Sequence, residues 1–497
     1  MQNLTRHITG PRAAPFFVPL ITGLLLFSMA PQQPLYDRLS LLDRAGLGMA
    51  VLSIVLFFTR TRLASLVIPL PLVGLLGLMG ISIAQMPQFF IVKDFLAFVL
   101  LFFFAVIAIA AGGMPGAIRG VALAGVLLAL LTTLYAFFLP HVAFEPGGQL
   151  RGAFGGSNSL AISLVLTIPA VICFSTRKRW STFVFRSVTV VWIGVEILMS
   201  TSKTSLIVFI ALLAIWLILW LRSKSKKIGV FALAALGLAV TVALANWTTI
   251  THALGKSSDL SGRFPLWEAY LSAIAERPLQ GYGWHVITTP DMALGQFIHS
   301  AFGHDLNNAN NDLLNWWALT GFLGPVVALV LVLSLIAGGL FIRRLPKSHN
   351  KNWVFLTGSL MFLLGLTELS TMHPDGWLIT SLASVALGTI LHENGTLSRF
   401  GTALRRLSLN KVDSTGHRNT SSMEVLYGTA SGMDEGGDGH VAQLPSYGIV
   451  AQSRGTVSTV VGCTMGVICA SSTFVPGVAA TTSKVRFWVA PGANSTR

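Results

Sequence analysis

The sequence predicts an all-α integral membrane protein with about twelve transmembrane helices. Three observations predict this class: hydrophobic residues make up 53% of the 497 residues, charged residues make up only 11%, and the mean hydropathy is +0.70. A soluble core of this length cannot bury so much apolar surface, so we expect a lipid bilayer to cover the rest.

Twelve apolar runs are near the length of about 20 residues that a membrane-crossing helix needs. They lie near 15–30, 45–59, 63–84, 95–112, 117–139, 159–175, 183–199, 205–221, 228–245, 313–341, 353–370 and 376–391. The predicted organisation has four parts: transmembrane helices 1–9 at 1–245, an outer loop with an amphipathic helix at 246–312, helices 10–12 at 313–396, and a low-complexity tail at 397–497. Disorder is the expectation for the tail, and its Thr and Gly content disfavours a thirteenth span there.

The distribution of positive charge predicts the orientation. With the N-terminus inside, thirteen Lys and Arg fall in short inner loops and five in short outer loops. This bias predicts cytoplasmic N- and C-termini and places 246–312 outside. The net charge of +15 then reflects topology, and we expect no nucleic-acid partner. The three cysteines lack metal-ligand spacing, so no metal site is predicted.

The outer loop contains SGRFPLWEAYLSAIAERPLQGYGW, residues 261–284. Pro265 suits the first turn of a helix, and Pro278 ends it. Apolar residues recur at helical spacing on one face: Trp267, Leu271 and Ile274. Arg263 stands just ahead of this helix, where a guanidinium and the N–H donors of a helix start together favour an anion. A helix held to anionic lipid is the alternative.

Two further cations lie at the predicted outer face. Arg151 stands with Asn158 in the Gly-rich stretch LRGAFGGSNSL before a span, and Lys203 lies in a very short turn between two helices. For Arg151 the alternative, and the commoner case for such a stretch, is a polar interfacial turn; for Lys203 the alternative is snorkelling to lipid head groups.

Asparagines and histidines precede the tenth predicted span. Asn307, Asn311 and Asn315 share a face if the helix begins that early, although asparagines at a helix start are usually caps. His299 and His304 are candidates for titration, although a loop histidine is more often simply solvated.

Two acids lie near the outer ends of their predicted spans. An ionisable group inside a membrane span costs free energy, so Glu196 and Glu368 are functional candidates. The alternative is a structural salt bridge of either acid with Lys203 or Arg263.

Four motifs, in order, resemble the O-antigen ligase and polysaccharide polymerase superfamily, most closely its exopolysaccharide polymerase branch. LSGRFPLWEAYLSAIAERPLQGYGW resembles the family's Gly-Arg pair, a tryptophan four residues later and Pro-x-x-Gly-x-Gly. Three other stretches resemble further family motifs. RGAFGGSN resembles the family's arginine-to-asparagine segment, and STSKTSL resembles its Ser-Arg-Thr turn. ANNDLLNWWALTGFLG resembles its Ala-His-Asn-x-x-Leu helix start with Gly-x-x-Gly. The resemblance covers residues 15–391. It has two departures: Asn310 replaces a histidine, and Lys203 replaces an arginine.

The resemblance implies a membrane glycosyltransferase of the bacterial inner membrane, without cofactor or obligatory metal. Such an enzyme joins repeat units that are linked to a polyprenyl diphosphate carrier, namely undecaprenyl diphosphate. The product is an exopolysaccharide or O-antigen at the periplasmic face. Its partners are the lipid-linked glycan donor, a glycan acceptor and the bilayer, and a partnership with other polysaccharide-export components stays open. The predicted cations for the leaving diphosphate are Arg263, Arg151 and Lys203. The predicted residues for the acceptor are Asn310, His304 and Glu368.

Three other functions stay open. An O-antigen ligase moves a finished glycan from the same carrier to lipid A core or protein. A polysaccharide transporter or flippase usually shows repeats with polar residues at the midplane, whereas here no internal repeat is evident and the polar groups gather at one face. Because Asn310 stands where the family has a histidine, the chain could also be a non-catalytic relative, and this function stays open.

Overall fold

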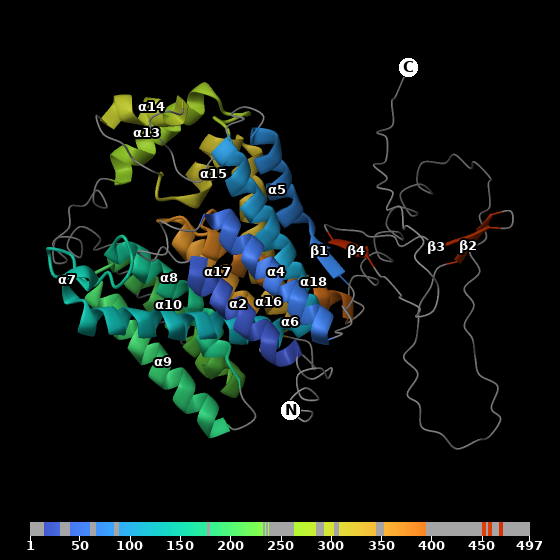
Figure 1. Cartoon of the computed structure of the whole chain (residues 1–497), viewed down its shortest axis with the longest axis horizontal. Coiled ribbons are helices and arrows are strands. Elements are labelled where there is room, and N and C mark those ends of the chain that lie inside the picture. Colours follow the sequence, from blue (N-terminus) through green and yellow to red (C-terminus); the bar gives the residue numbers. More distant parts are fainter. Residues whose placement is uncertain are drawn as a thin grey trace.

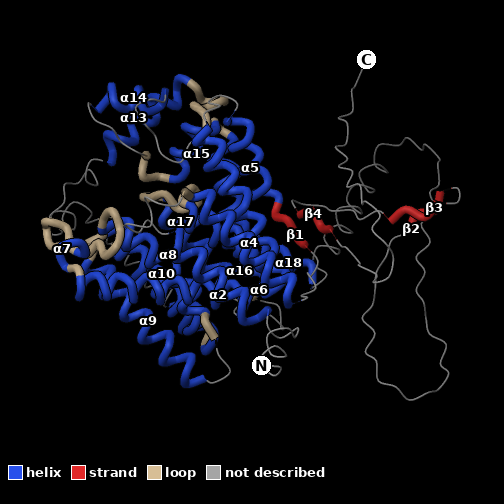
Figure 2. Tube along the Cα trace, viewed as in Figure 1, coloured by secondary structure: helices blue, strands red, loops and turns tan. Residues whose placement is uncertain are grey.

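The computed structural model describes residues 14–29, 40–59, 66–83, 89–175, 179–231, 234, 237, 263–284, 293–302, 308–343, 352–393, 450–453, 456–459 and 467–470. Helices dominate this part of the chain (Figure 2). The helices are α2 (Ala14–Met29), α4 (Leu41–Thr59), α5 (Leu70–Ile83), α6 (Phe89–Phe138), α7 (Pro140–Ala143), α8 (Ser157–Cys173), α9 (Arg179–Met199), α10 (Lys203–Lys224), α13 (Arg263–Glu276), α14 (Ala293–Phe302), α15 (Asp312–Thr320), α16 (Leu323–Ile342), α17 (Trp353–Gly365) and α18 (Pro374–Glu393).

Five of the described helices contain segments long and apolar enough to cross a membrane. These are Val92–Phe138, Trp180–Met199, Lys203–Lys224, Leu323–Ile342 and Pro374–Glu393. Four described helices are apolar but shorter: Phe17–Met29, Leu70–Ile83, Ser157–Cys173 and Trp353–Gly365. The chain is thus a helical membrane protein, whereas the count of twelve and the orientation stay predictions. Most of the ninth predicted run, 228–245, lies outside the described residues.

Helix α6 is the centre of the bundle and packs against α2, α4, α8 and α18. It bends at Gly113, whose backbone has φ 62° and ψ −178°. A positive φ favours glycine, and Pro115 cannot donate the hydrogen bond that would continue a regular helix. The bend therefore divides α6 into two arms, which correspond to the two separate runs predicted at 95–112 and 117–139.

Close contact between α2 and α6 depends on small residues. A Cβ added at Gly120 would lie 2.6 Å from Cβ of Thr22, and one added at Gly23 would lie 2.9 Å from the Gly120 carbonyl oxygen. Small residues let helix backbones approach each other where no hydrophobic effect drives helices together, as in lipid. This pair thus holds the N-terminal helix to the bundle centre.

The bundle exposes apolar side chains, as expected for a surface that faces lipid. On α9, Trp180 is 75% exposed and Val191 is 65% exposed. In water such a continuous apolar face would be unfavourable, whereas lipid tails solvate it without cost.

The tenth predicted run, 313–341, is not one helix. It is divided into α15 and α16 at Gly321, which has φ 73°. The apolar pattern continues across this break, so hydropathy alone could not locate it. The break matters for function because another segment docks on it, as described below.

Helices α13 and α14 lie at one end of the molecule, beyond the bundle (Figure 1). Helix α13 confirms the predicted helix and ends at Glu276, ahead of Pro278. One detail of that prediction is wrong: Arg263 lies at the start of the helix and not ahead of it. Leu271 is 50% exposed. The buried face is formed by Leu266, Ala269, Tyr270, Ala273 and Ile274, because α13 packs against α14 and α15.

Four short strands accompany the helices. β1 (Leu66–Pro69) pairs antiparallel with β4 (Val467–Ala470), and β2 (Val450–Ser453) pairs antiparallel with β3 (Thr456–Thr459). Within 397–497 the structure describes β2, β3 and β4 alone. Each of them contains a valine, which has high strand propensity. β4 lies inside residues 457–475, the stretch considered as a thirteenth span. The disorder expected for the rest of this tail is outside the described residues.

Candidate functional site

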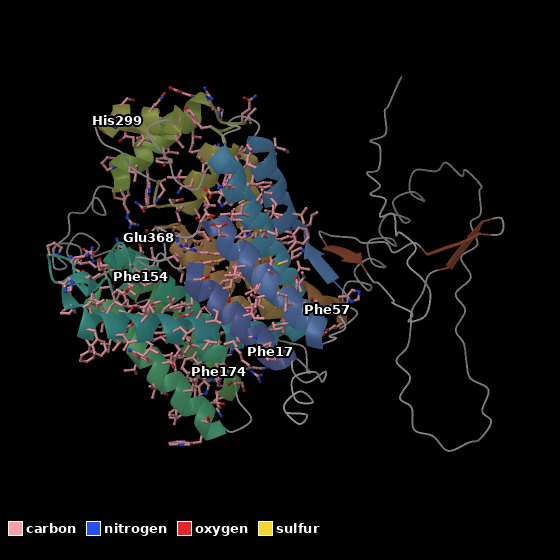
Figure 3. The ribbon with its side chains drawn as sticks, in the orientation of Figure 1. Phe17, Phe57, Phe154, Phe174, His299 and Glu368 are labelled. Atoms are coloured by element: carbon pink, nitrogen blue, oxygen red, sulfur yellow. The ribbon has the colours of Figure 1, made fainter. Side chains whose placement is uncertain are left out.

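The turn between α17 and α18, residues 366–373, receives polar contacts from two distant segments. Arg263 of α13 reaches it from one segment, and Asn311 and Asp312 reach it from the other. In Figure 3 the labelled side chain of Glu368 lies between α13 and the helical bundle. This turn is therefore the centre of the candidate site.

Arg263 is anchored to this turn by two groups. Its Nη2 lies 2.5 Å from Oε1 of Glu368, and its Nη1 donates to the Thr367 carbonyl oxygen. The Arg263 side chain is 16% exposed and that of Glu368 is 7% exposed. A guanidinium has five N–H donors in a planar fork. The two contacts fix the plane of the fork and leave further donors for an anion that approaches from the exposed side.

The pairing of Glu368 with Arg263 confirms one of the alternatives that the sequence left open. A carboxylate already in contact with a guanidinium is poorly placed to take a proton from an acceptor hydroxyl. We therefore assign Glu368 an orienting role toward Arg263 in place of the predicted role of base.

Asp312 is the residue of this site that the sequence analysis missed. It is buried, and its carboxylate accepts hydrogen bonds from the backbone N–H groups of Ser370, at 2.9 Å, and Thr371, at 2.7 Å. The hydroxyls of the same two residues also contact Oδ2. Burial raises the pKa of Asp312, and these hydrogen bonds oppose that rise. Asp312, the first residue of α15, thus fastens the 366–373 turn to the start of this helix.

The asparagines before α15 are structural caps. Asn311 is the N-cap: its Oδ1 accepts from Leu314 N at 3.0 Å, and its Nδ2 donates to the Leu366 carbonyl oxygen at 3.0 Å. Nδ2 of Asn315 donates to the Asn311 carbonyl oxygen. The predicted shared face of Asn307, Asn311 and Asn315 is wrong for the last two, because the helix begins only at Asp312. Asn307 lies outside the described residues.

Asn310 lies next to the Arg263 helix. Its φ is 49°, in the left-handed region where asparagine is one of the few tolerated residues. The preceding carbonyl oxygen, that of Ala309, accepts a hydrogen bond from Nε1 of Trp267 at 2.9 Å. Trp267 follows Arg263 by one helical turn, so this bond places the Asn310 backbone beside α13. His304 lies outside the described residues.

Two glycine motifs form one backbone junction. The segment of Pro-x-x-Gly-x-Gly, residues 278–283, packs against the break at Gly321. Tyr282 N donates to the Ala318 carbonyl oxygen at 2.8 Å, and Phe322 N donates to that of Pro278 at 2.9 Å. A Cβ on Gly321 would lie 2.0 Å from the Leu279 carbonyl oxygen. Only glycine fits, and the junction fastens the end of α13 to α15 and α16.

Arg151 and Lys203 form a second group. Leu150 N donates to the Met199 carbonyl oxygen at 3.0 Å, which joins the segment before α8 to the turn before α10. Nε of Arg151 donates to the Val142 carbonyl oxygen at 2.8 Å, and Lys203 is the first residue of α10. The short turn predicted for Lys203 is confirmed.

An acid already contacts the start of α8. Oε1 of Glu145 accepts a hydrogen bond from Ser157 N, the first residue of the helix, at 2.7 Å. A carboxylate at this place uses the same donors that an external anion would use. We therefore assign no anion site to this helix start.

The two groups lie toward the same side of the bundle. Oγ of Ser163, in the second turn of α8, lies 3.4 Å from Oδ2 of Asp375 at the start of α18. Ser163 is six residues, or about 9 Å, beyond the start of α8. Helix α8 thus connects the loop of Arg151 with the end of the 366–373 turn.

Glu196 is separate from this site. It is buried on α9, and its Oε1 accepts a hydrogen bond from Thr133 Oγ1 of α6 at 2.9 Å. Among the described residues, no group of three or more His, Cys, Asp or Glu is placed to hold a metal ion.

A family model described as O-antigen ligase matches residues 188–329. The matched segment contains the start of α10 with Lys203, helix α13 with Arg263, and the residues just before α15 with Asn310. Arg151 and Glu368 lie outside it. No curated protein matches the chain.

Proposed function

We propose that this chain is a membrane glycosyltransferase that polymerises lipid-linked repeat units, because a family model described as O-antigen ligase matches residues 188–329. The donor is a polyprenyl-diphosphate-linked glycan, and the product is an exopolysaccharide or O-antigen at the periplasmic face of the inner membrane. The observation that carries the proposal is the Arg263 guanidinium, held at a partly exposed position by Glu368 and Thr367.

The reaction breaks the bond between the anomeric carbon and the diphosphate oxygen. Negative charge grows on the diphosphate as this bond breaks, and a cation fixed in advance stabilises that charge without reorganisation. Arg263 meets this requirement because its two protein contacts fix the guanidinium plane. Its position as the first residue of α13 adds the positive end of a helix dipole.

Arg151 and Lys203 are proposed to bind the same carrier less directly. Part of the Arg151 fork is used on the Val142 carbonyl oxygen, and an ammonium such as that of Lys203 is a point charge with little power to orient a phosphate. We propose that these two cations raise the affinity for the carrier, whereas Arg263 stabilises the departing charge.

A ligase is the second candidate function, because the matching family model is described as O-antigen ligase. Polymerase and ligase share the donor and the leaving group and differ in the acceptor. Membranes that contain the protein should therefore be given a purified lipid-linked repeat unit, with and without lipid A core, and the products separated on a gel. A ladder of chain lengths without core supports polymerase. Transfer that requires core supports ligase, and no transfer to either acceptor contradicts the proposal.

A further inference from the structure

His373 and Asp375 form a pair at the junction between the 366–373 turn and α18. Nδ1 of His373 lies 3.8 Å from Oδ2 of Asp375. This Nδ1 atom is buried and has no hydrogen-bond partner, whereas the His373 side chain as a whole is 30% exposed. The exposure therefore belongs to the rest of the side chain, which includes Nε2.

Asp375 is almost completely buried. The residue is only 4% exposed. Ser163 of α8 lies within 3.4 Å of Oδ2, the positive charge of Arg44 on α4 acts on the carboxylate, and Oδ1 has no hydrogen-bond partner. A buried carboxylate beside one ring nitrogen orients an imidazole and stabilises its protonated form.

The His373–Asp375 pair adjoins the same 366–373 turn that holds the Arg263–Glu368 pair. Asp312 holds Ser370 and Thr371, and a Cβ added at Gly376 would lie 1.7 Å from the Ser370 carbonyl oxygen. The turn is therefore folded tightly around Ser370. Glu368 and His373 are two and three residues from Ser370, so their Cα atoms lie within about 8 and 11 Å of its Cα.

We propose that His373, oriented by Asp375, is the general base that activates the acceptor hydroxyl. The proposal rests on the proposed glycosyl transfer. Nε2 takes the hydroxyl proton while the acceptor oxygen bonds to the anomeric carbon. The bond from that carbon to the diphosphate oxygen breaks, and its electron pair leaves on the diphosphate held by Arg263. The imidazolium then releases its proton to water.

This assignment accounts for the departure at Asn310. An amide neither gains nor loses charge near neutral pH and cannot serve as a base, whereas histidine changes its charge between about pH 5 and 8. The contact between Nδ1 and Oδ2 is longer than a hydrogen bond, and catalytic hydrogen bonds are often long before the substrate binds. A modest rotation of the imidazole closes it.

The test measures transfer from the lipid-linked repeat unit in membranes between pH 5 and 8. His373→Gln should lower the rate by about 10²–10⁴-fold, the usual contribution of a general base, with little change in donor KM. His299→Gln, which changes an exposed histidine on α14, is the matched control and should behave as wild type.

Asp375→Asn should give a smaller loss and a displaced pH profile. Removal of the negative charge destabilises the imidazolium, so the histidine stays neutral to lower pH and the acid limb of the rate should move to lower pH. A purely structural role of Asp375 would lower the rate at every pH without this displacement.

The possible results separate the role of His373 from the proposed glycosyl transfer. A wild-type rate and pH profile in His373→Gln overturns the role of His373 but leaves the proposed transfer intact, because the wild type still works. A wild type without transfer overturns the proposed function and this role with it. If His373→Gln is lost from the membrane, Asp375→Asn decides: a displaced acid limb supports the proposal, and an unchanged limb overturns it.

Discussion

Replacement of Gly321 by alanine should loosen the junction that holds the Arg263 helix. The new Cβ would lie 2.0 Å from the Leu279 carbonyl oxygen and 2.4 Å from its carbon, so the backbone has to move by more than 1 Å. The φ of 73° adds strain of about 1–3 kcal/mol for a residue with a side chain. Loss of the hydrogen bonds from Tyr282, Gly283 and Phe322 across the junction adds about 0.5–1.5 kcal/mol each. Together these terms predict a destabilisation of about 3–7 kcal/mol.

The assay is thermal unfolding of the detergent-purified protein, read together with glycan transfer. Gly77→Ala is the matched control, because a Cβ at Gly77, inside α5, meets nothing within 4 Å. It should leave stability unchanged or raise it by up to about 1 kcal/mol through helix propensity. A Gly321→Ala protein that unfolds at the same temperature as Gly77→Ala would refute the reasoning, since it would mean that the two motifs do not interlock.

Three further predictions concern the site and its orientation. Asp312→Asn should lower the unfolding temperature by several degrees, because an amide nitrogen would face the N–H donors of the 366–373 turn; unchanged stability would remove the assigned role of Asp312. Asn310→Ala should lower the transfer rate modestly without displacing its pH profile, as measured across pH 5–8, and a displaced profile would indicate a titrating group there. A reporter active only outside should work after Leu254, and one active only inside should work after Lys226; the reverse result would place Arg263 in the cytoplasm.

Local patterns predicted the parts of the fold that depend on a few neighbouring residues. Pro278 marked the end of α13, and the gap between two apolar runs coincided with the bend at Gly113. Asparagine preference for helix starts matched Asn311, the cap of α15. In each case the determining residue lies within one turn of the feature, so its spacing in the sequence carries the signal.

Features that depend on tertiary contacts were predicted poorly. Asp312 acts on Ser370, 58 residues away, and its sequence context reads simply as the first turn of a helix. The buried face of α13 shows the same limit, because Ala269, Tyr270 and Ala273 are part of it where α15 and α14 cover the helix.

The candidate site itself was predicted in part. The pairing of Glu368 with Arg263 was one of two alternatives, because a costly acid near a cation suggests a partner without naming it. His373 and Asp375 were not predicted, although the sequence contains a local indication of them. A histidine lies two residues before an acid, at the start of a predicted span and five residues after Glu368.

The central claim is that Arg263 stabilises the departing diphosphate and does not merely hold the fold. Its most direct test compares Arg263→Gln with the double variant Arg263→Gln, Glu368→Gln, by thermal unfolding and by transfer from a lipid-linked repeat unit. The single variant removes the guanidinium that faces a mostly buried Glu368 carboxylate, which lowers stability, and it should lose about 10²–10³-fold in transfer rate. The double variant also removes the negative charge of that carboxylate, so it should recover stability but not transfer. Transfer by the double variant at the wild-type rate would contradict the claim.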